Sequence, residues 1–561
     1  MNEKIGVYVC ECGPNIPDRI DIDKVLAEVS VIDGVKTAKK FGLLCSPDGK
    51  NFLEEDIKKE ELTHAVIAAC SPRDHEQTFM TVAVKAGLNP YLTQLVNIRE
   101  QCAWIYSDKQ EATRMAIKSI RAGISRVKHH LSLTKKELEM NPDVLVIGGG
   151  VAGVEACLSL AGTGRRIYLV EKAEELGGTV SKLGALIPHQ GTAVDLFGEK
   201  IDRVRAQDDI EVITGHDVTS ARGFLGNFEI EIEPQGDSSE IRNLQVGAVV
   251  IATGFGLLSS EHLDTNNGEK NPNIVSALEF ESMLAQNAVV GKDGKPPRSV
   301  ALIHCVGRAE LGYCSKVCCL YMIKYAHHLK SMDASTKVTS FYTDLCLPDK
   351  SDQAYYDEAV KQGIRFLRSD APSIQSAEGQ VTVEYSTGGG KSASEKFDLV
   401  VLAPAMVPGE DTARLADMFN LPLDDTGFFK EIHMMLDPVA TPIEGVFVTG
   451  CAMGPRNIPE TITQSQAAAG KILGSLIPGR KLEPEVKVSE VRADFCTGCQ
   501  TCLTVCFYAA ISFDESRGIS VVNEAICRGC GSCVGSCPSG AIRAKHFTYP
   551  QIYREVLEIL S

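Results

Sequence analysis

The chain has 561 residues, a length that suggests three or four domains of ordinary size. Its formal net charge of −16 argues against nucleic-acid binding. The opening residues MNEKIGVYVCECG lack the pattern of a secretory signal, and no apolar run reaches the roughly 20 residues that span a bilayer. We therefore expect a cytoplasmic protein without membrane insertion, whose 20 cysteines stay reduced and available as metal ligands.

Residues 1–135 read as a first α/β domain with a parallel sheet, because short apolar runs alternate with amphipathic patterns. Strands are predicted at IGVYVC, THAVIAAC and PYLTQLVNI, and helices at DIDKVLAEV, HEQTFMTVAVKAG and QEATRMAIKSIRAGISRVKHH. Cys10 and Cys12 end the first strand, Cys45 follows a later one, and Cys70 ends the run VIAAC. We expect the four thiols to gather at the carboxyl edge of the sheet, where such sheets bind ligands. Their spacing leaves a 4Fe–4S cluster, zinc and free thiols all open.

A nucleotide-binding pattern opens the next domain. The segment DVLVIGGGVAGVEACLSLAGTGRRIYLVEK places Gly148, Gly150 and Gly153 between an apolar strand and a helix. The glycines allow a tight turn and a pyrophosphate at the helix N-terminus, and Glu171 ends the next strand, where an acid binds the ribose hydroxyl. The pattern alone could be a loop without a ligand, but strand, helix and acid all stand in order.

We expect FAD rather than NAD at this motif, because it begins the larger domain, predicted over 141–262 and, after an interruption, over 408–480. Further turns resemble those of two-dinucleotide, thioredoxin-reductase-like flavoproteins, although Cys451 stands where those reductases usually carry Asp. The remaining candidate cofactor-binding residues in these turns are Lys172, Gly178, Thr253, Gly254, Gly450, Cys451 and Ile458.

The interrupting α/β unit, predicted over 263–407, lacks a second glycine motif. After its strand VALIHCVG come four cysteines in fifteen residues, Cys305, Cys314, Cys318 and Cys319. Gly307 and Gly312 do not rebuild a nucleotide loop. The thiols are predicted to converge on one 4Fe–4S cluster, the alternative being buried cysteines that act as small hydrophobes. With a cluster there, NAD(P)H would not bind this domain in the usual way.

Residues 487–545 predict a bacterial-ferredoxin-like α+β domain, followed by a C-terminal helix over 546–561. The runs CTGCQTCLTVC and CRGCGSCVGSCP both have the spacing C-x2-C-x2-C-x3-C of paired 4Fe–4S clusters, in which the fourth cysteine of each run ligates the other cluster. One predicted ligand set is Cys496, Cys499, Cys502 and Cys537, and the other is Cys527, Cys530, Cys533 and Cys506. Phe507 replaces the usual Pro, and zinc is a poor alternative for this spacing.

Three segments, CVGR…YCSKVCC, TGCAMGPRNIPET and NPYLTQLVNIREQCAW, resemble the A subunit of heterodisulfide reductases, and the resemblance covers nearly the whole chain. It implies one FAD, several 4Fe–4S clusters including one at the N-terminal cysteines, and flavin-based electron bifurcation or its reverse. It also implies that Lys324 lies near the flavin, the alternative being a surface lysine on a helix. The partners implied are sister redox subunits and ferredoxin, around a homodimer.

One departure separates this chain from the long members of that family. The segment GFLGNFEIEIEPQGDSSEIRNLQVGAVVIATG runs on without an inserted ferredoxin module. The short form resembles relatives attached to benzoyl-CoA reductase or to quinone-interacting complexes, and the absence of the module leaves one electron branch, and so full bifurcation, open. Two rival functions are a free-standing NAD(P)H-dependent flavin reductase with a ferredoxin tail and a non-catalytic electron-relay scaffold. Cys102, Cys157 and Cys346 are expected to be ordinary buried or helical cysteines.

Overall fold

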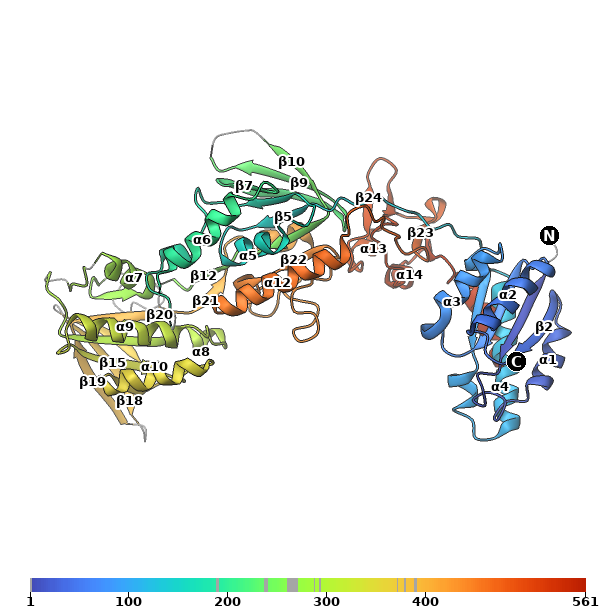
Figure 1. The fold of residues 1–561 in the computed structure, drawn as a ribbon, viewed down its shortest axis with the longest axis horizontal. Helices are drawn as coiled ribbons and strands as arrows, with labels where there is room; N and C mark the ends of the chain where they lie inside the picture. Colours follow the sequence, from blue (N-terminus) through green and yellow to red (C-terminus); the bar gives the residue numbers. More distant parts are fainter. Residues whose placement is uncertain are drawn as a thin grey trace. The chain divides into compact units, whose positions relative to one another are not determined.

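The computed structural model describes residues 3–187, 191–236, 241–259, 271–286, 288–291, 294–370, 372–377, 380–387 and 391–561. The chain forms two compact units, one of residues 1–138 with 483–561 and one of residues 139–482 (Figure 1). Both divisions fall between the domain boundaries expected from the sequence, but the union of the first and last segments was not predicted. Among the described helices, none combines the length and apolar character needed to cross a membrane.

The N-terminal sheet of the first unit is parallel, with the strand order β2-β1-β3-β4. Its strands are β1 (Ile5–Cys10), β2 (Val35–Phe41), β3 (His64–Ala69) and β4 (Thr93–Asn97). One face packs on α1 (Ile22–Ser30) and α4 (Lys109–Val127), and the other on α2 (Pro47–Lys59) and α3 (Pro72–Lys85). The three predicted strands and three predicted helices are present. The strand expected before Cys45 is the partly exposed edge strand β2, whereas helix α2 was not predicted.

The C-terminal segment completes the first unit. It has two antiparallel strand pairs and two short helices, namely β23 (Ser489–Val491) with β26 (Ile542–Ala544), β24 (Ile511–Asp514) with β25 (Ile519–Val522), α13 (Thr501–Thr504) and α14 (Ser532–Ser536). Helix α15 (Tyr549–Leu560) packs along α4. Arg126 and Glu555 form an ion pair at 2.5 Å, and the Gln551 amide donates to the His129 carbonyl oxygen at 3.1 Å.

The second unit begins with a five-stranded parallel sheet of order β22-β11-β5-β6-β7. These strands are β5 (Val144–Ile147), β6 (Ile167–Val170), β7 (Ile210–Ile213), β11 (Ala248–Ile251) and β22 (Val446–Val448). Three helices cover one face, α5 (Val151–Leu160), α6 (Ala193–Arg205) and α12 (Ile458–Ser475), and α5 and α12 run side by side (Figure 1). An antiparallel sheet covers the other, formed by β8 (His216–Phe224), β9 (Asn227–Pro234) and β10 (Arg242–Val246). Burial on both faces explains why the strands read as unbroken apolar runs.

A second parallel sheet lies within this unit, with the order β13-β20-β14-β15-β16. Its strands are β13 (Ile274–Ser276), β14 (Ser299–Val306), β15 (Lys337–Tyr342), β16 (Arg365–Arg368) and β20 (Leu399–Pro404). One face packs on α7 (Ala277–Ala285), α9 (Cys318–Met332) and α10 (Lys350–Lys361), and the other on the antiparallel strands β17 (Ser373–Ala377), β18 (Gln380–Thr387) and β19 (Lys391–Phe397). Where the chain enters and leaves this domain, β12 (Phe255–Leu257) pairs with β21 (Met406–Pro408). The strands of this second sheet therefore lie between β11 and β22 of the first sheet along the chain.

Candidate redox centres

The glycine loop between β5 and α5 has no room for a side chain at Gly148 or Gly153. A Cβ at Gly153 would lie 1.8 Å from the Gly148 carbonyl oxygen, and a Cβ at Gly148 would lie 2.5 Å from the Ala252 carbonyl oxygen. Gly148 also has a φ of 107°, which side chains rarely adopt. Strand, loop and helix therefore approach closely, as in a nucleotide site whose pyrophosphate lies at a helix N-terminus. Gly178 lies against the same loop, because its Cβ would be 3.2 Å from the Gly150 Cα.

Two hydroxyl groups beside this loop support a fit to FAD. Thr253 follows β11 and Thr449 follows β22, so both stand at the carboxyl edge that also holds the glycine loop. In the described part of the chain their buried hydroxyl oxygens have no hydrogen-bond partner. Buried polar groups without partners are uncommon, and a bound polar cofactor would satisfy them. The space at Gly254 is open, since nothing lies within 4 Å of its Cβ position.

Glu171, the predicted ribose-binding acid, lies at the glycine loop. The side chain of Lys172, the next residue, makes its ion pair elsewhere. Glu171 accepts hydrogen bonds from the backbone N–H groups of Gly149 at 2.5 Å and Ala173 at 2.8 Å. Its carboxylate thus ties the end of β6 to the loop. Lys172 instead forms an ion pair with Asp411 at 3.1 Å, just before α11 (Thr412–Phe419). The structure therefore shows Lys172 in a contact that the sequence did not predict.

The segment after β22 packs onto the nucleotide helix. Gly450 has a φ of 67°, and its Cβ would lie 3.0 Å from that of Ala152 in α5. Ile458 begins α12, which Asn457 caps by accepting from the Glu460 N–H at 2.8 Å. The Cys451 thiol donates to the Arg456 carbonyl oxygen at 3.4 Å, and burial raises the pKa of Cys451. This position therefore presents a neutral thiol where the reductases it resembles usually have a carboxylate.

Lys324 is buried rather than on the surface, which excludes the surface-lysine alternative. Its ammonium lies 2.7 and 2.8 Å from the two carboxylate oxygens of Glu281 and 3.2 Å from the Ala185 carbonyl oxygen. Glu281 also accepts from the Gly184 N–H at 2.7 Å. Burial lowers the pKa of Lys324, and the Glu281 carboxylate opposes that shift. The pair connects α7 and α9 of the interrupting domain to the segment that follows Gly178.

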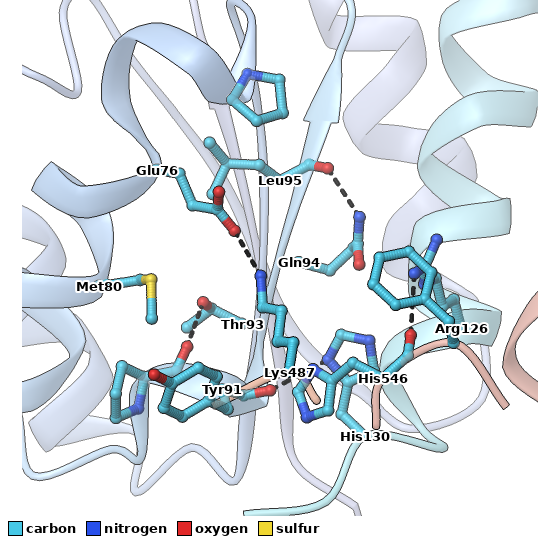
Figure 2. Close-up of a pocket in the computed structure, with 13 residues that line it drawn as sticks. Glu76, Met80, Tyr91, Thr93, Gln94, Leu95, Arg126, His130, Lys487 and His546 are labelled. Carbon is cyan, nitrogen blue, oxygen red and sulfur yellow. Dashed lines mark hydrogen bonds and ion pairs between the residues drawn. The ribbon is translucent and has the colours of Figure 1, made fainter. Parts of the chain in front are cut away.

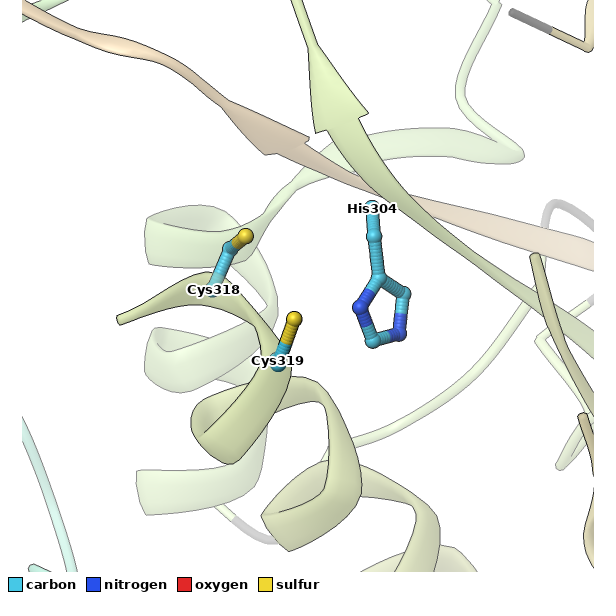
Figure 3. A group of neighbouring side chains, drawn as sticks. All are labelled: His304, Cys318 and Cys319. Carbon is cyan, nitrogen blue, oxygen red and sulfur yellow. The ribbon is translucent and has the colours of Figure 1, made fainter. Parts of the chain in front are cut away.

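Cys305, Cys318 and Cys319 come together at the carboxyl end of β14. A register shift between Ile303 and Val306 and the positive φ of 57° at Cys305 redirect the chain there. Cys318 and Cys319 begin α9 and are almost fully buried. The side chain of His304 faces them, and the ligand atoms of His304, Cys318 and Cys319 all lie within 4.8 Å of one another (Figure 3).

The thiols of this group are hydrogen-bonded to one another. The Cys318 thiol, hydrogen-bonded to both neighbours, lowers the pKa of Cys305 to about 5 and that of Cys319 to about 4. The same contacts raise the pKa of Cys318 itself. Because thiolates rather than thiols bind metals, two of the three groups are suited to coordination at neutral pH.

A fifth cysteine belongs to the same neighbourhood. The Cys346 N–H donates to the Cys319 sulfur at 3.3 Å. Burial raises the pKa of Cys346, and the charges of Cys314 and Cys319 raise it further, so all three thiols lie close together. Cys346 was expected to be an ordinary buried cysteine. The missed signal is that it follows β15, the strand beside β14, and therefore reaches the same sheet edge.

The four N-terminal cysteines gather at the carboxyl edge of their sheet. Cys10 ends β1, and its pKa is raised by burial and by the charges of Cys12 and Cys45. Burial raises the pKa of Cys70, which follows β3, to about 11, and the charge of Cys12 adds to that shift. Cys12 has a positive φ of 52°, and its sulfur accepts a hydrogen bond from Arg99 Nη1 at 3.1 Å. Cys10, Cys12, Cys45 and Cys70 therefore all border one buried cluster of side chains, and their role as ligands stays a prediction.

The ferredoxin-like segment brings its cysteines into two groups. The pKa of Cys533 is raised by burial and by the charges of Cys527, Cys506 and Cys530, which places these four together. The Thr501 hydroxyl lowers the pKa of Cys499, while the charge of Cys537 opposes it. The fourth cysteine of each run thus lies near thiols of the other run, and the assignment of these thiols to two clusters stays a prediction. The remaining thiols, Cys496 and Cys502, flank Cys499 in its run.

The first unit also contains a pocket of about 80 Å³, lined from both of its chain segments (Figure 2). Lys487 and Glu76 form an ion pair across it at 2.9 Å. The rings of His130 and His546 lie 4.4 Å apart, and His130 Nδ1 donates to the Tyr91 carbonyl oxygen at 3.1 Å. The volume suits about two or three waters and no dinucleotide. None of its lining residues is a cysteine, so the pocket is separate from the redox centres.

Two family models match the chain. The pyridine nucleotide-disulphide oxidoreductase family matches residues 142–469, which hold the nucleotide loop and the interrupting domain. The 4Fe–4S dicluster domain matches residues 495–541, which hold both cysteine runs. The two-dinucleotide flavoprotein fold and the ferredoxin-like domain expected from the sequence are thereby confirmed.

Curated relatives match over almost the full length, and all three named here are A subunits of heterodisulfide reductases. The first of two CoB–CoM heterodisulfide reductase iron–sulfur A subunits of Methanopyrus kandleri is 32% identical, over 92% of this chain and 91% of the relative. The corresponding iron–sulfur A subunit of Methanocaldococcus jannaschii is 31% identical, over 98% of both chains. The A subunit of the H2:CoB–CoM heterodisulfide,ferredoxin reductase of Methanothermobacter marburgensis is 32% identical, over 100% of this chain and 97% of the relative.

Proposed function

The chain belongs to the family of heterodisulfide reductase A subunits, and we propose that it is the flavin hub that passes electrons between partner subunits of such a complex. Bound FAD would supply the exchange between two-electron and one-electron transfer, and 4Fe–4S clusters would supply one-electron relays. The protein's own part is to hold these groups at fixed places and to set the charge around them.

Helix α9 is the observation that carries this proposal. Its first turn contributes Cys318 and Cys319 to the thiol group of the interrupting domain. Further along the same helix, Lys324 contacts the Ala185 carbonyl oxygen of the flavin domain. One rigid element therefore joins a cysteine site to the domain with the nucleotide loop. This arrangement favours direct electron exchange between a cluster and the flavin over a nicotinamide cofactor in that domain.

We propose four cluster sites and assign their ligands by the groups described above. The two C-terminal runs hold one pair of clusters. A third site uses Cys305, Cys314, Cys318 and Cys319, and a fourth uses the N-terminal thiols Cys10, Cys12, Cys45 and Cys70. The low pKa values of Cys305 and Cys319 and the gathering of thiols at two sheet edges support the latter two sites.

The first test is the content of iron, sulfide and flavin per chain after purification without oxygen. We expect one FAD and about sixteen irons, four for each cluster. About eight irons would eliminate both unusual cysteine sites and return the interrupting domain to an ordinary reductase role. A second measurement addresses the rival functions: rapid NADH oxidation by the isolated chain would support a free-standing reductase, and a flavin that resists photoreduction would support a scaffold.

We also propose that the hub divides electron pairs between two acceptors, or combines them in reverse, within a complex built on a homodimer. Several cysteine sites in one chain support this, because they provide more than one exit from the flavin. The assembled complex should then reduce a ferredoxin only while a second, higher-potential acceptor is turned over. Equal ferredoxin reduction without that acceptor would leave a simple relay.

A further inference from the structure

Among the described residues, Arg99 is a cationic side chain that directly contacts a sulfur of the N-terminal thiol group, that of Cys12. Arg99 begins a short π-helical turn (Arg99–Ala103) after β4. Its Nη1 donates to the Cys12 sulfur at 3.1 Å. Its charge lowers the pKa of Cys70, whereas burial, the largest effect, and the charges of Glu100 and Asp74 raise it. One guanidinium therefore acts on two of the four thiols that the proposed function assigns to the fourth cluster.

The geometry of Arg99 is fixed by its other contacts. Glu100 accepts from both Nε at 3.0 Å and Nη2 at 2.6 Å, and Asp74 lies 3.3 Å from Nη2. These contacts leave Nη1 to the Cys12 sulfur. The Trp104 ring covers the guanidinium, with 5.0 Å between Cζ and the ring centroid. The Arg99 side chain is only 19% exposed, so water screens its charge weakly.

We propose that Arg99 is a positioning residue of the N-terminal centre, which holds the Cys12 sulfur and raises the reduction potential of a cluster bound there. This inference rests on the proposed fourth cluster. Reduction adds one electron and therefore one negative charge to the centre, with no bond formed or broken. A fixed positive charge and a hydrogen bond to a ligand sulfur both stabilise the reduced state. The guanidinium keeps its proton throughout, because arginine is not deprotonated in proteins.

The test is a reductive titration of the complete, cluster-loaded chain followed by EPR. The signal that disappears in Cys70→Ser identifies the N-terminal centre. We expect Arg99→Gln to lower its midpoint potential, with about a tenfold weaker affinity for the electron, or about 59 mV for one electron. Arg99→Lys, which keeps the charge but loses the fork, should shift the potential in the same direction by less. Arg114→Gln, which removes a charge from an exposed pair with Glu111 on α4, should leave the potential unchanged.

Trp104 provides an independent readout, because it is the only tryptophan in the chain and contacts Arg99. Its fluorescence should change when the N-terminal centre is reduced, and the midpoint of that change should shift in Arg99→Gln together with the EPR signal. A midpoint that stays in place in both Arg99 variants would overturn the inference. So would a loss of about four irons in Arg99→Gln with an unshifted potential in Arg99→Lys, since Arg99 would then be purely structural.

The absence of an N-terminal cluster would give a different result from a wrong role for Arg99. If Cys70→Ser removes no EPR signal and no iron, the N-terminal thiols hold no cluster, and the role of Arg99 falls with them. If Cys70→Ser removes a signal that Arg99→Gln does not shift, the cluster is real and the role of Arg99 alone is wrong. The iron content of Cys70→Ser distinguishes the two cases: it is unchanged if the N-terminal thiols hold no cluster, and it falls if they hold one.

Discussion

The Lys324 ammonium lies within 2.8 Å of both carboxylate oxygens of Glu281, and both side chains are almost fully buried. A buried ion pair depends on both partners, because removing one leaves the other as an uncompensated buried charge. The pair lies where the interrupting domain meets the segment that follows the glycine turn of the flavin domain. The placement of the interrupting domain against the flavin domain therefore depends on the charges of Lys324 and Glu281.

Removing one partner of this pair should be costly. Lys324→Met leaves the Glu281 carboxylate buried without a counter-charge, and we expect a loss of about 3–5 kcal/mol of stability. Thermal unfolding followed by circular dichroism would report it as a lower midpoint. The double variant Lys324→Met with Glu281→Gln should recover most of the loss. The exposed pair Lys316–Glu460 is a matched control, and Lys316→Met should cost about 0–1 kcal/mol. If Lys324→Met and Lys316→Met lost equal amounts of stability, the burial of the Lys324–Glu281 ion pair would be contradicted.

Flavin binding should depend on the missing Cβ at Gly153. In Gly153→Ala the new methyl group would meet the Gly148 carbonyl oxygen, so the loop must move away from the helix. We expect the purified variant to contain less than about a tenth of the flavin of the parent chain, since the pyrophosphate site depends on that approach. Absorbance of released flavin per chain measures this. Gly198→Ala in α6, where nothing lies within 4 Å, should keep its flavin.

The cysteines of the interrupting domain should differ in their effect on iron. Cys318→Ser should lower the iron content by about four atoms per chain, because it removes a ligand of one cluster. Cys346→Ser should leave the iron count unchanged, since four other thiols suffice. Cys157→Ser is the control, because Cys157 is a core residue of α5. Loss of iron in Cys346→Ser and not in Cys314→Ser would move the ligand assignment to Cys346.

The junction between α15 and the N-terminal domain should weaken in acid. Burial lowers the pKa of His130 to about 3, and an unfolded histidine has a pKa of about 6.5. Between those values the opened state binds more protons than the closed state, so closure loses stability as the pH falls below about 6.5. We expect a loss of about 1 kcal/mol between pH 7 and pH 5.5. Hydrogen exchange of α15 amides, corrected for intrinsic rates, measures it.

His130→Phe provides the control for that prediction. The variant keeps an aromatic ring beside His546 and removes the titrating group. Its α15 amides should show a smaller change between the two pH values. An unchanged pH dependence would assign the effect to another group, of which His546 is the nearest, since burial lowers its pKa as well.

Much of the fold follows from local sequence patterns. The features that the sequence did not reveal depend on contacts between residues far apart in the chain. The glycine loop, both ferredoxin runs and the helix at α4 are each encoded in a few neighbouring residues. The place of Cys346 beside the other thiols was missed because it depends on β15 lying beside β14. No local spacing in the sequence reveals that pairing. His304 was missed for a related reason: a histidine inside an apolar strand reads as core until the bulge after Ile303 is known.

Lys324 shows the same limit in another form. On α9 it stands in the pattern CCLYMIKYAHHLKSM, where a lysine can equally face water. Its burial depends on Glu281, which comes from a different helix, and on a carbonyl group of the flavin domain. The family resemblance placed this lysine near the flavin, whereas composition and periodicity alone left it open. The partner acid was not predicted.

The union of the first and last segments has a consequence for synthesis on the ribosome. Arg126 and Glu555 are 429 positions apart, so the surface of α4 emerges long before the helix that covers it. At roughly 5–20 residues per second, that surface waits about 20 to 90 seconds for α15. During this interval Arg126 lacks its partner Glu555, and the face of α4 that meets α15 stays uncovered. The first unit therefore closes only after the last residues of the chain have left the ribosome.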